Sequence, residues 1–379
     1  MAARVEVRVF TRADQILVHA QAWDELIGLM PRPSPFLLTR WVVPWWEAYG
    51  DPSRELAVLA AFRDDRLVGL LPLVVRSLRG VRVAGFMGEE QSALCDIALA
   101  PGESDETARA LLAGCRLIGF DVANLFGLPL GSILARVAGS RAQVIERVPA
   151  PVIEVRETFA ELYRRVYKSE RRREHAKKRR RLERLGALTF ETAATAAEVA
   201  AVLPDAQRIF LARRADLLDG SHFVTPIGRR FHERTLVELA GDGRVRLVTA
   251  RLDGRPIAFY LYLVVGGSAV AHALGHLPHY GRHSIGMLTM FEALRGAIDD
   301  DRVKRFEFLG GDEPYKRSLT TSREPLMQLI GLAESRRGRV LERVILRGVQ
   351  GRVWMRDREL ARRLYVRVAV PLARRRRHV

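Results

Sequence analysis

Hydrophobic residues in the second half of the chain recur with two different periods, and these periods predict a series of strands and helices. Short alternating or continuous apolar runs predict strands, whereas apolar residues spaced three or four apart predict helices. The turn pairs Asp253-Gly254 and Gly266-Gly267 join three of the runs as hairpins. The predicted strands cover 186–193, 245–252, 255–265, 268–275, 302–310 and 325–333, and the predicted helices cover 197–219, 228–240 and 284–298. We expect the order strand, two helices, three strands, helix, strand, short helix, strand.

The first half of the chain repeats part of this plan. It begins with a predicted strand at 5–10, continues with helices at 15–30 and 41–49, and then forms a hairpin at 55–75. The hairpin AFRDDRLVGLLPLVV resembles the later ARLDGRPIAFYLYLVV, and GFDVANLFGLP resembles RFEFLGGDEP in the same order. Two matches in one order predict an internal duplication. The Pro-rich stretch 148–151 marks the boundary between the halves.

Length and composition favour two globular domains. The chain has 379 residues, of which 48% are hydrophobic, so two cores can be buried. The first ten residues alternate like a strand and do not resemble a signal peptide. The most apolar run, 256–265, is far shorter than the ~20 residues of a membrane helix. Two cysteines, Cys95 and Cys115, cannot build a disulfide framework. We expect a soluble cytoplasmic protein with no transmembrane segment.

The net charge of +18 is concentrated in two segments. Residues 164–184 carry twelve basic and three acidic side chains, and residues 336–379 carry fifteen and three. The rest of the chain has a net charge of −3. Charge localised in this way favours a polyanionic partner, which is either the phosphates of a cofactor, RNA or an anionic lipid surface.

Several strings in order resemble a known family. They are PSPFLLTRWVVPWWEAYG, RDDRLVGLLPLV, the Arg-rich segment ending RRRLERLG, SIGMLTMFEALR and FEFLGGDEPYK. This set resembles the CelD-type acetyltransferases associated with cellulose and exopolysaccharide synthesis, which are BioF-like relatives of the Fem-type aminoacyl-tRNA transferases. The resemblance covers most of residues 10–330.

The resemblance implies an α/β (α+β) protein with two tandem GNAT-like domains, each a mixed, mostly antiparallel sheet flanked by helices. We place a degenerate GNAT-like domain at 1–155, the acyltransferase domain with its basic leading helix at 156–335, and a basic helical tail at 336–379. The implied reaction is acyl transfer to an amine or hydroxyl, from acyl-CoA or, in the Fem branch, from aminoacyl-tRNA.

The start of the helix at 284 is the candidate donor-binding site. GNAT enzymes hold the CoA pyrophosphate with backbone N–H groups at a helix start, usually within Q/R-x-x-G-x-G/A. The positive end of the helix and its unpaired donors favour an anion there. The matching residues are Arg282, His283, Ser284, Ile285, Gly286 and Met287, although His283 and Leu288 depart from the pattern. A helix start capped by Ser284, without a ligand, is the alternative interpretation.

The string Gly310–Lys316 is the candidate catalytic segment, because it follows a predicted strand. Tyr315 matches the position of the tyrosine that protonates the departing CoA thiolate in many GNAT enzymes, a role that suits a phenol. Lys316 would stabilise negative charge or hold a substrate carboxylate, and Asp312 or Glu313 would accept the proton of the nucleophile. A structural turn with an aromatic plug is the alternative.

Histidines cluster in the sequence between these two segments, at His272, His276, His279 and His283. They lack the spacing of a metal site, so we expect no metal. His272 shares a predicted strand face with Val270 and Leu274, which favours a core residue. If that face lines the cleft, His272 becomes a rival general base. Phosphate-loop, HExxH and GxSxG motifs are absent from the sequence.

Aromatic residues recur at helical spacing in both halves of the chain. The tryptophans Trp41, Trp45 and Trp46 recur at helical spacing, which favours core packing over a substrate platform. Tyr163 and Tyr167 precede the basic run, as a helix that stacks RNA bases would arrange them, and a solvated helix is the alternative.

Three functions remain open from the sequence. The first is an acyl-CoA-dependent acyltransferase whose acceptor is a small molecule, saccharide or peptide. The second is a Fem-like transferase that binds tRNA through 164–184 and 336–379. The third is a non-catalytic module that binds a polyanion or an anionic membrane surface.

Overall fold

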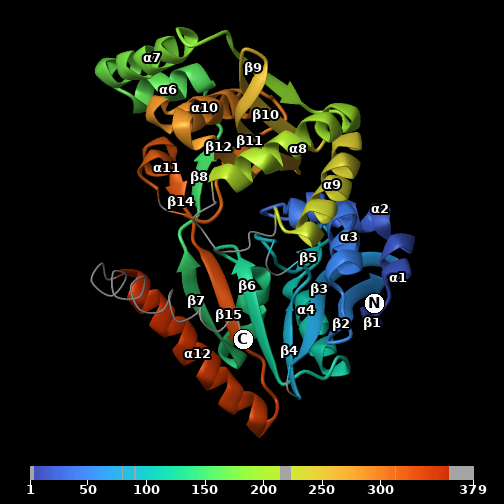
Figure 1. Cartoon of the computed structure of the whole chain (residues 1–379). Helices are drawn as coiled ribbons and strands as arrows, with labels where there is room; N and C mark the ends of the chain where they lie inside the picture. The colour runs from blue at the N-terminus through green and yellow to red at the C-terminus, as the bar shows by residue number, and fades with distance from the viewer. Residues whose placement is uncertain (1–3, 79, 89–90, 214–222, 312, 358–379) are drawn as a thin grey trace, which may run out of the picture.

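The computed structural model describes residues 4–78, 80–88, 91–213, 223–311 and 313–357, which fold around two β-sheets (Figure 1). The first sheet has the order β1-β2-β3-β4-β6-β15-β7, and β5 pairs with β3 at its side. Its strands are β1 (Glu6–Phe10), β2 (Arg54–Arg63), β3 (Arg66–Leu78), β4 (Val81–Phe86), β5 (Ala98–Leu99), β6 (Val122–Leu128), β7 (Ala142–Val148) and β15 (Leu326–Gly331).

The second sheet has the order β14-β8-β13-β12-β11-β10-β9. Its strands are β8 (Pro151–Glu154), β9 (Leu188–Ala193), β10 (Val245–Leu252), β11 (Arg255–Val265), β12 (Ser268–His276), β13 (Arg305–Glu307) and β14 (Ser322–Arg323). The strands predicted at 186–193 and 245–275 are confirmed, whereas the strand predicted at 302–310 is only three residues long.

Both sheets share one topology. In each, four antiparallel strands are followed by one parallel pair, which is β4 with β6 in the first sheet and β12 with β13 in the second. Each sheet then takes a strand from the other half of the chain, because β15 inserts between β6 and β7 and β8 inserts between β13 and β14. The tandem GNAT-like arrangement is confirmed, but neither 1–155 nor 156–335 contains a complete sheet.

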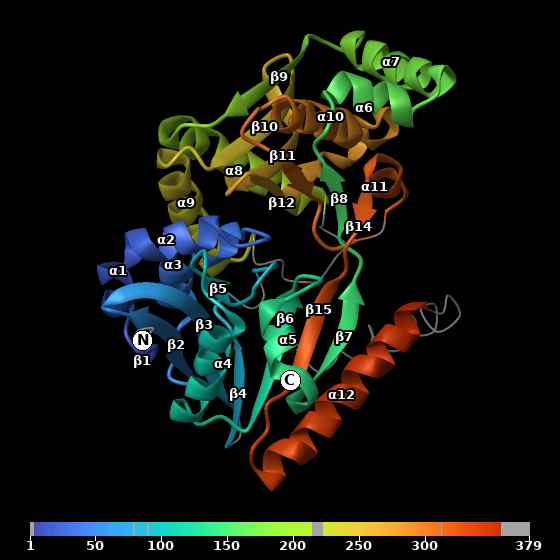
Figure 2. The ribbon, with the colours of Figure 1, turned by 180° about the vertical axis from the view of Figure 1, so that it is seen from behind.

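Helices cover the sheets on both sides (Figure 1, Figure 2). Those of the first half are α1 (Ala13–Val18), α2 (Ala20–Gly28), η1 (Pro35–Leu37), α3 (Thr39–Tyr49), α4 (Asp105–Gly114), η2 (Cys115–Leu117), α5 (Ile133–Ala138) and η3 (Gly139–Arg141). Those of the second half are α6 (Phe159–Val166), α7 (Ser169–Glu183), α8 (Ala196–Arg213), α9 (Pro226–Gly241), η4 (Pro278–His283), α10 (Ile285–Ile298), α11 (Pro314–Leu319) and α12 (Arg336–Asp357).

The hydrophobic core is divided by the second sheet. One buried cluster joins the first sheet to the α8 and α9 face of the second, so the two halves share a core. A separate cluster fills the space between the second sheet, α6 and α10. Trp23, Trp41 and Trp45 are fully buried in the shared core, which confirms core packing for Trp41 and Trp45. The hydrophobic side chains buried in the shared core stabilise the packing of the two halves against each other.

The central hairpins form where turn residues predict them. In the β2–β3 turn Asp64 and Asp65 have φ of 49° and 58°, and in the β10–β11 turn Asp253 and Gly254 have φ of 48° and 74°. Two consecutive positive φ values define the turn whose twist matches paired strands. Asp tolerates this conformation and Gly favours it, so both hairpins are specified locally.

A buried ion cluster fastens the first half to the second. Arg32 donates two hydrogen bonds to Glu307 on β13, at 3.0 and 2.7 Å, and lies 3.2 Å from Glu324. Arg305 pairs with Glu307, Glu154 and Glu324 at 2.7, 2.7 and 2.6 Å. Arg32 is 6% exposed and Glu307 is 1% exposed, so these charges depend on one another for solvation.

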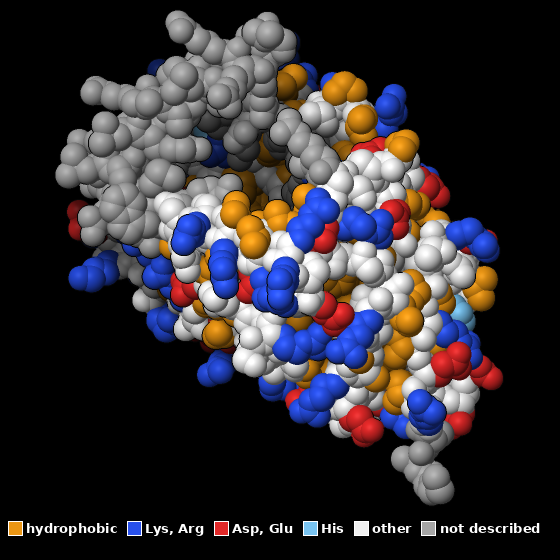
Figure 3. Space-filling view, turned by 90° about the horizontal axis from the view of Figure 1, so that it is seen from below, with side chains coloured by type: hydrophobic (Ala, Val, Ile, Leu, Met, Phe, Trp, Pro, Cys, Tyr) orange, Lys and Arg blue, Asp and Glu red, His pale blue; other side chains and the backbone are white. Residues whose placement is uncertain are grey.

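The last described helix, α12, lies against the β6 and β15 side of the first sheet. Leu346 and Val349 pack on Val122 and Ile330, while Val340 and Val344 are more than half exposed on the outer face among arginines. Seen from below the view of Figure 1, Lys and Arg side chains are spread among hydrophobic ones, with acidic groups interspersed (Figure 3). The predicted helical tail is confirmed for 336–357, and 358–379 lie outside the described residues. No helix in the described part of the chain is long and apolar enough to cross a membrane.

Candidate active site

The candidate site lies where β12 and β13 separate. The two strands pair in parallel only from Ser268 to Val270, opposite Arg305 to Glu307. Strand β12 then continues to His276 beside β11, whereas β13 ends at Glu307. The chain segments that leave these strand ends are the two predicted site segments, η4 with the start of α10, and 310–316. The topology therefore brings both segments to one opening in the sheet.

A bulge in β12 places His272 on the side that faces the first half. Tyr262 pairs with Ala271 and Leu261 pairs with Ala273, so His272 has no partner in the ladder. At a bulge, two consecutive side chains point to the same side of the sheet. The prediction that His272 and Leu274 share a face is therefore wrong, because Leu274 packs on the other side of the sheet, in the cluster with α6 and α10. The ring of His272 is partly exposed and contacts aromatic rings from both halves, which are Phe36, Trp41 and Phe223.

A hydrogen-bond chain orients His272. His232 on α9 binds the carbonyl oxygen of Gly228 through Nδ1 at 2.7 Å, and its Nε2 lies 3.0 Å from Nε2 of His272. Because a carbonyl only accepts, His232 donates from Nδ1 and, when neutral, accepts at Nε2. His272 then donates from Nε2 and keeps a lone pair on Nδ1. Burial, and next the neighbouring His232, hold the pKa of His272 well below its ordinary value. His272 is therefore a neutral, oriented base.

The start of α10 presents backbone donors beside cationic side chains. Ser284 has φ of 56°, and its side chain makes no capping hydrogen bond, so the interpretation of Ser284 as a side-chain cap is wrong. Within the described residues, the N–H groups of Ile285 and Gly286 have no acceptor. Arg282 donates to His283 at 3.1 Å, and desolvation with the charges of Arg282 and Arg181 lowers the pKa of His283. This end of the helix suits an anion.

His276 is a site residue that sequence reasoning missed. A Cβ placed on Gly286 would lie 2.9 Å from His276 Nδ1, and one on Gly281 would lie 3.1 Å from Nε2, so the ring fills the space under the start of α10. Its Nδ1 is buried and has no hydrogen-bond partner in the described structure. Burial, followed by the charge of Arg213, lowers its pKa. The glycine four residues beyond Arg282 was the only sequence signal for this close approach.

Tyr315 lies on α11 and packs against the cluster on the α10 side of the sheet. Burial, and next the charge of Glu313, raise the pKa of Tyr315 to about 12, and Arg213 opposes them. Tyr260 on β11 lies close enough that Tyr315 and Glu313 contribute to the raised pKa of its own hydroxyl. Tyr315 therefore keeps its proton at neutral pH.

Lys316 is engaged within its own loop. Its side chain is 7% exposed, and its Nζ lies 2.9 Å from Glu313 and donates to the carbonyl oxygen of Gly310 at 3.2 Å. These contacts tie Lys316 to Gly310 and to Glu313, and they occupy the Glu313 carboxylate. Asp312, the other predicted proton acceptor, lies outside the described residues.

The remaining predicted residues do not form a second site. No group of His, Cys, Asp or Glu in the described part of the chain could hold a metal ion. The ring of His279 packs against that of Tyr280 at a tilt of 44°. Tyr163 and Tyr167 face Phe291 and His175 in an aromatic cluster, in which Tyr167 is buried and Tyr163 is partly exposed, so base stacking on Tyr163 stays a prediction.

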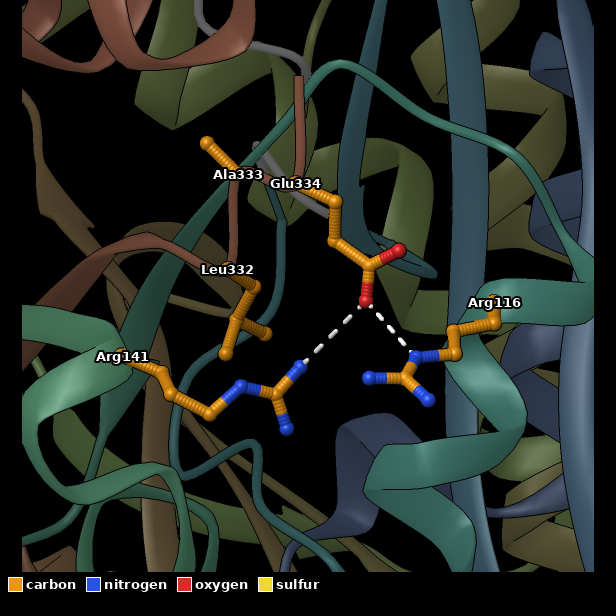
Figure 4. Close-up of a pocket in the computed structure, with 5 residues that line it drawn as sticks. All are labelled: Arg116, Arg141, Leu332, Ala333 and Glu334. Carbon is orange, nitrogen blue, oxygen red and sulfur yellow. Dashed lines mark hydrogen bonds and ion pairs between the residues drawn. The ribbon is translucent and has the colours of Figure 1, made fainter. Parts of the chain in front are cut away.

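A cavity of about 400 Å³ lies far from this opening, beside the strand end that leads into α12 (Figure 4). Arg116 and Arg141 point toward its centre from two sides, and Glu334 lies between them at 2.9 and 3.7 Å. The Glu334 carboxylate occupies the space between the two guanidinium groups, where an anion would have to contact both of them.

Comparisons with known proteins agree with this geometry. A protein-family model described as an acetyltransferase (GNAT) domain matches residues 169–317, which include α7 to α11. The fold resembles that of FemX, with a TM-score of 0.61, 11% identity and coverage of 86% of this chain and 96% of FemX. No curated protein sequence matches the chain.

Two further structures share the fold. A conserved protein of unknown function from Bacteroides thetaiotaomicron has a TM-score of 0.55, 11% identity and coverage of 86% of this chain and 99% of its own. The C-terminal domain of a putative lysylphosphatidylglycerol synthetase from Agrobacterium fabrum has a TM-score of 0.52, 11% identity and coverage of 86% and 94%. At these identities the likeness concerns the fold.

Proposed function

This chain carries a GNAT domain within a Fem-like double-GNAT fold, and we propose that it is an acyltransferase that moves an acyl group, in the simplest case acetyl, from acyl-CoA to an amine or hydroxyl. The carrying observation is that two proton-transfer groups lie on opposite faces of the sheet where β12 and β13 separate. His272 faces the first half of the chain, and Tyr315 packs on the α10 side.

The donor fits the start of α10. Ile285 and Gly286 offer backbone N–H groups to a pyrophosphate, and Arg282 adds positive charge beside them. Gly286 leaves no room for a side chain, because His276 already fills that space. Backbone donors and a close backbone approach are what a phosphate site requires.

The reaction is a direct attack. The acceptor nitrogen or oxygen attacks the thioester carbon, a C–N or C–O bond forms, and the C–S bond breaks. His272 Nδ1 takes the proton of the nucleophile, because its lone pair is fixed by the chain through His232 to Gly228. Tyr315 gives its proton to the departing thiolate, which its raised pKa makes available throughout the neutral range. Lys316 and Glu313 position Tyr315 by fixing the loop.

Aminoacyl-tRNA is the second candidate donor, and α7 is the observation that favours it. In this helix only His175 and Leu182 are buried, and its other faces carry arginines and lysines. Positive charge on a solvated helix suits a nucleic-acid backbone. Helix α12, which packs on the first sheet, also carries exposed arginines, and these would bind an anionic membrane surface as well as RNA.

Calorimetric titration with CoA tests the proposed donor. We expect the wild type to bind CoA and Gly286→Ala to lose most of that affinity, because a Cβ 2.9 Å from His276 displaces the ring or the helix start. Gly296→Ala is the matched control on the same helix, since its Cβ meets Tyr262 at an ordinary 3.5 Å. Absence of CoA binding at millimolar concentration, with acyl transfer that depends on charged tRNA, overturns the acyl-CoA proposal in favour of the second donor.

A further inference from the structure

A second cavity lies close to the proposed donor site. It has a volume of about 220 Å³ and lies between α6, α7 and α10. The aromatic rings of Phe159, Tyr163 and Phe291 contribute to its lining. This volume is below the ~300–1,000 Å³ of a complete small-molecule site, so it suits one ring system of a larger ligand. Phe159 and Phe291 are buried beneath the surface of the cavity, whereas Tyr163 is partly exposed, so its ring is the one on which a flat base can stack.

Arginines surround the mouth of the cavity. Arg172, Arg179 and Arg295 line it, and Glu292 is its one acidic lining residue. Glu292 lies 3.4 Å from Arg179 and 2.6 Å from Arg295, and Arg179 also pairs with Glu183 at 3.0 Å, so two carboxylates face the three arginines. The Arg172 guanidinium donates to the carbonyl oxygen of Tyr167 at 2.5 Å, and this hydrogen bond holds the Arg172 side chain against the C-terminal end of α6. The cavity therefore combines aromatic surface with excess positive charge.

The position of the cavity relates it to the donor. Leu288, Phe291 and Arg295 line it from α10, and Leu288 lies in the first turn of that helix. At 1.5 Å rise per residue, these residues lie about 5–15 Å from the helix start. Helix α7 packs against η4, and its Arg181 acts on His283 at the same start. A ligand whose phosphates bind at the start of α10 can thus place its other end in the cavity.

Helix α7 gains little from burial. Only His175 and Leu182 among its 15 residues are buried, although α6 and α10 beside it contribute several core residues. Helices are normally stabilised in proteins by an apolar face that packs on the core. His175 accepts or donates a 2.8 Å hydrogen bond with Tyr163 and so holds the wall of the cavity in place.

We propose that this cavity binds the adenosine end of the donor, with the base against the ring of Tyr163 and with Arg179 and Arg295 near the phosphate on its ribose. The inference rests on acyl-CoA as the proposed donor and adds to it the part of the chain that recognises the nucleotide. The phosphates at the start of α10 would anchor the middle of the donor, and the thiol end would reach the opening between β12 and β13.

Calorimetry with three probes tests this assignment: CoA, 3′,5′-ADP and 4′-phosphopantetheine. We expect Arg179→Ala/Arg295→Ala to weaken CoA and 3′,5′-ADP by about tenfold or more, because charge-assisted hydrogen bonds to phosphate are lost. Phosphopantetheine should bind the variant as it binds the wild type, which also shows that the donor site is folded. Arg173→Ala/Arg180→Ala removes the same charge from exposed positions of α7 outside the cavity and should change nothing.

Glu292→Gln provides a second variant that preserves the shape of the cavity. Removing the acidic charge beside a bound phosphate should leave the affinity for 3′,5′-ADP equal or higher. If the two double-arginine variants lose equal affinity for 3′,5′-ADP, or if neither loses any, the cavity assignment is overturned. CoA binding by the wild type would in that case still uphold the proposed function. Absence of CoA and phosphopantetheine binding to the wild type contradicts the proposed function itself.

Discussion

Replacing Arg32 by Met should destabilise the protein more than any single surface ion pair would. The substitution keeps a side chain of similar length but leaves Glu307, which is 1% exposed, with one fewer positive partner. Breaking a buried ion pair from one side typically costs 3–5 kcal/mol, because the remaining charge stays desolvated. Arg305 still donates to Glu307 at 2.7 Å, so we expect the lower end, about 3 kcal/mol.

The coupling between the two residues can be measured in a double-mutant cycle. We expect urea unfolding to show that the double variant loses less free energy of unfolding than the single variants Arg32→Met and Glu307→Gln lose together. The difference should be about 1–3 kcal/mol. Tryptophan fluorescence and far-UV circular dichroism should be followed together, since free energies are defined only where the two transitions coincide.

The control is an ion pair of similar length at the surface. Arg8 lies 2.8 Å from Glu6, and their side chains are 40% and 61% exposed. Arg8→Met should therefore change the free energy of unfolding by about 1 kcal/mol or less. A loss below about 1 kcal/mol for Arg32→Met, or strictly additive losses in the cycle, would refute the reasoning that this cluster fastens the two halves.

Three further outcomes follow from the site. Tyr315→Phe should lower kcat about 10²-fold with an unchanged KM for the donor; equal kcat values in the variant and the wild type would leave α11 without an acid. Because the pKa of His272 is held well below 6.5 and that of Tyr315 is raised to about 12, the base is neutral and the acid protonated across the neutral range. kcat/KM should thus stay level from pH 7 to 9 and fall only well below pH 6.5; a fall centred at or above 6.5 contradicts His272 as the base. If α7 holds tRNA through six phosphates of a single-stranded segment, log K against log salt should have a slope of about −4, whereas CoA binding should depend on salt far less.

Local patterns in the sequence determined much of the second half of the chain. The hairpins at 64–65 and 253–254 form where Asp and Gly tolerate positive φ, and the helix at 284 begins within one residue of the predicted start. Turns and helix starts depend on the residue types at adjacent positions, and these can be read from the sequence.

Side-chain environments were less accessible to prediction. Asp96 is an acidic residue whose local sequence gives no sign of burial, yet it is 5% exposed and accepts hydrogen bonds from Ser132, Ile133 and Leu134 at the start of α5. Burial raises its pKa, and these hydrogen bonds oppose the shift. The partners lie more than 35 residues away, and no local spacing relates them.

Only the tertiary structure decided how the halves are joined. Strand β15 completes the first sheet and β8 completes the second, although each is local to the other half of the sequence. Arg32 meets Glu307 across 275 residues, and one inserted residue in β12 turns His272 toward Trp41. A strand's apolar pattern specifies that it is buried but not beside which edge, and the register of a bulge depends on the strand it pairs with. The sequence alone therefore determined the elements and the donor helix, while long-range pairing decided which side chains face one another across the opening.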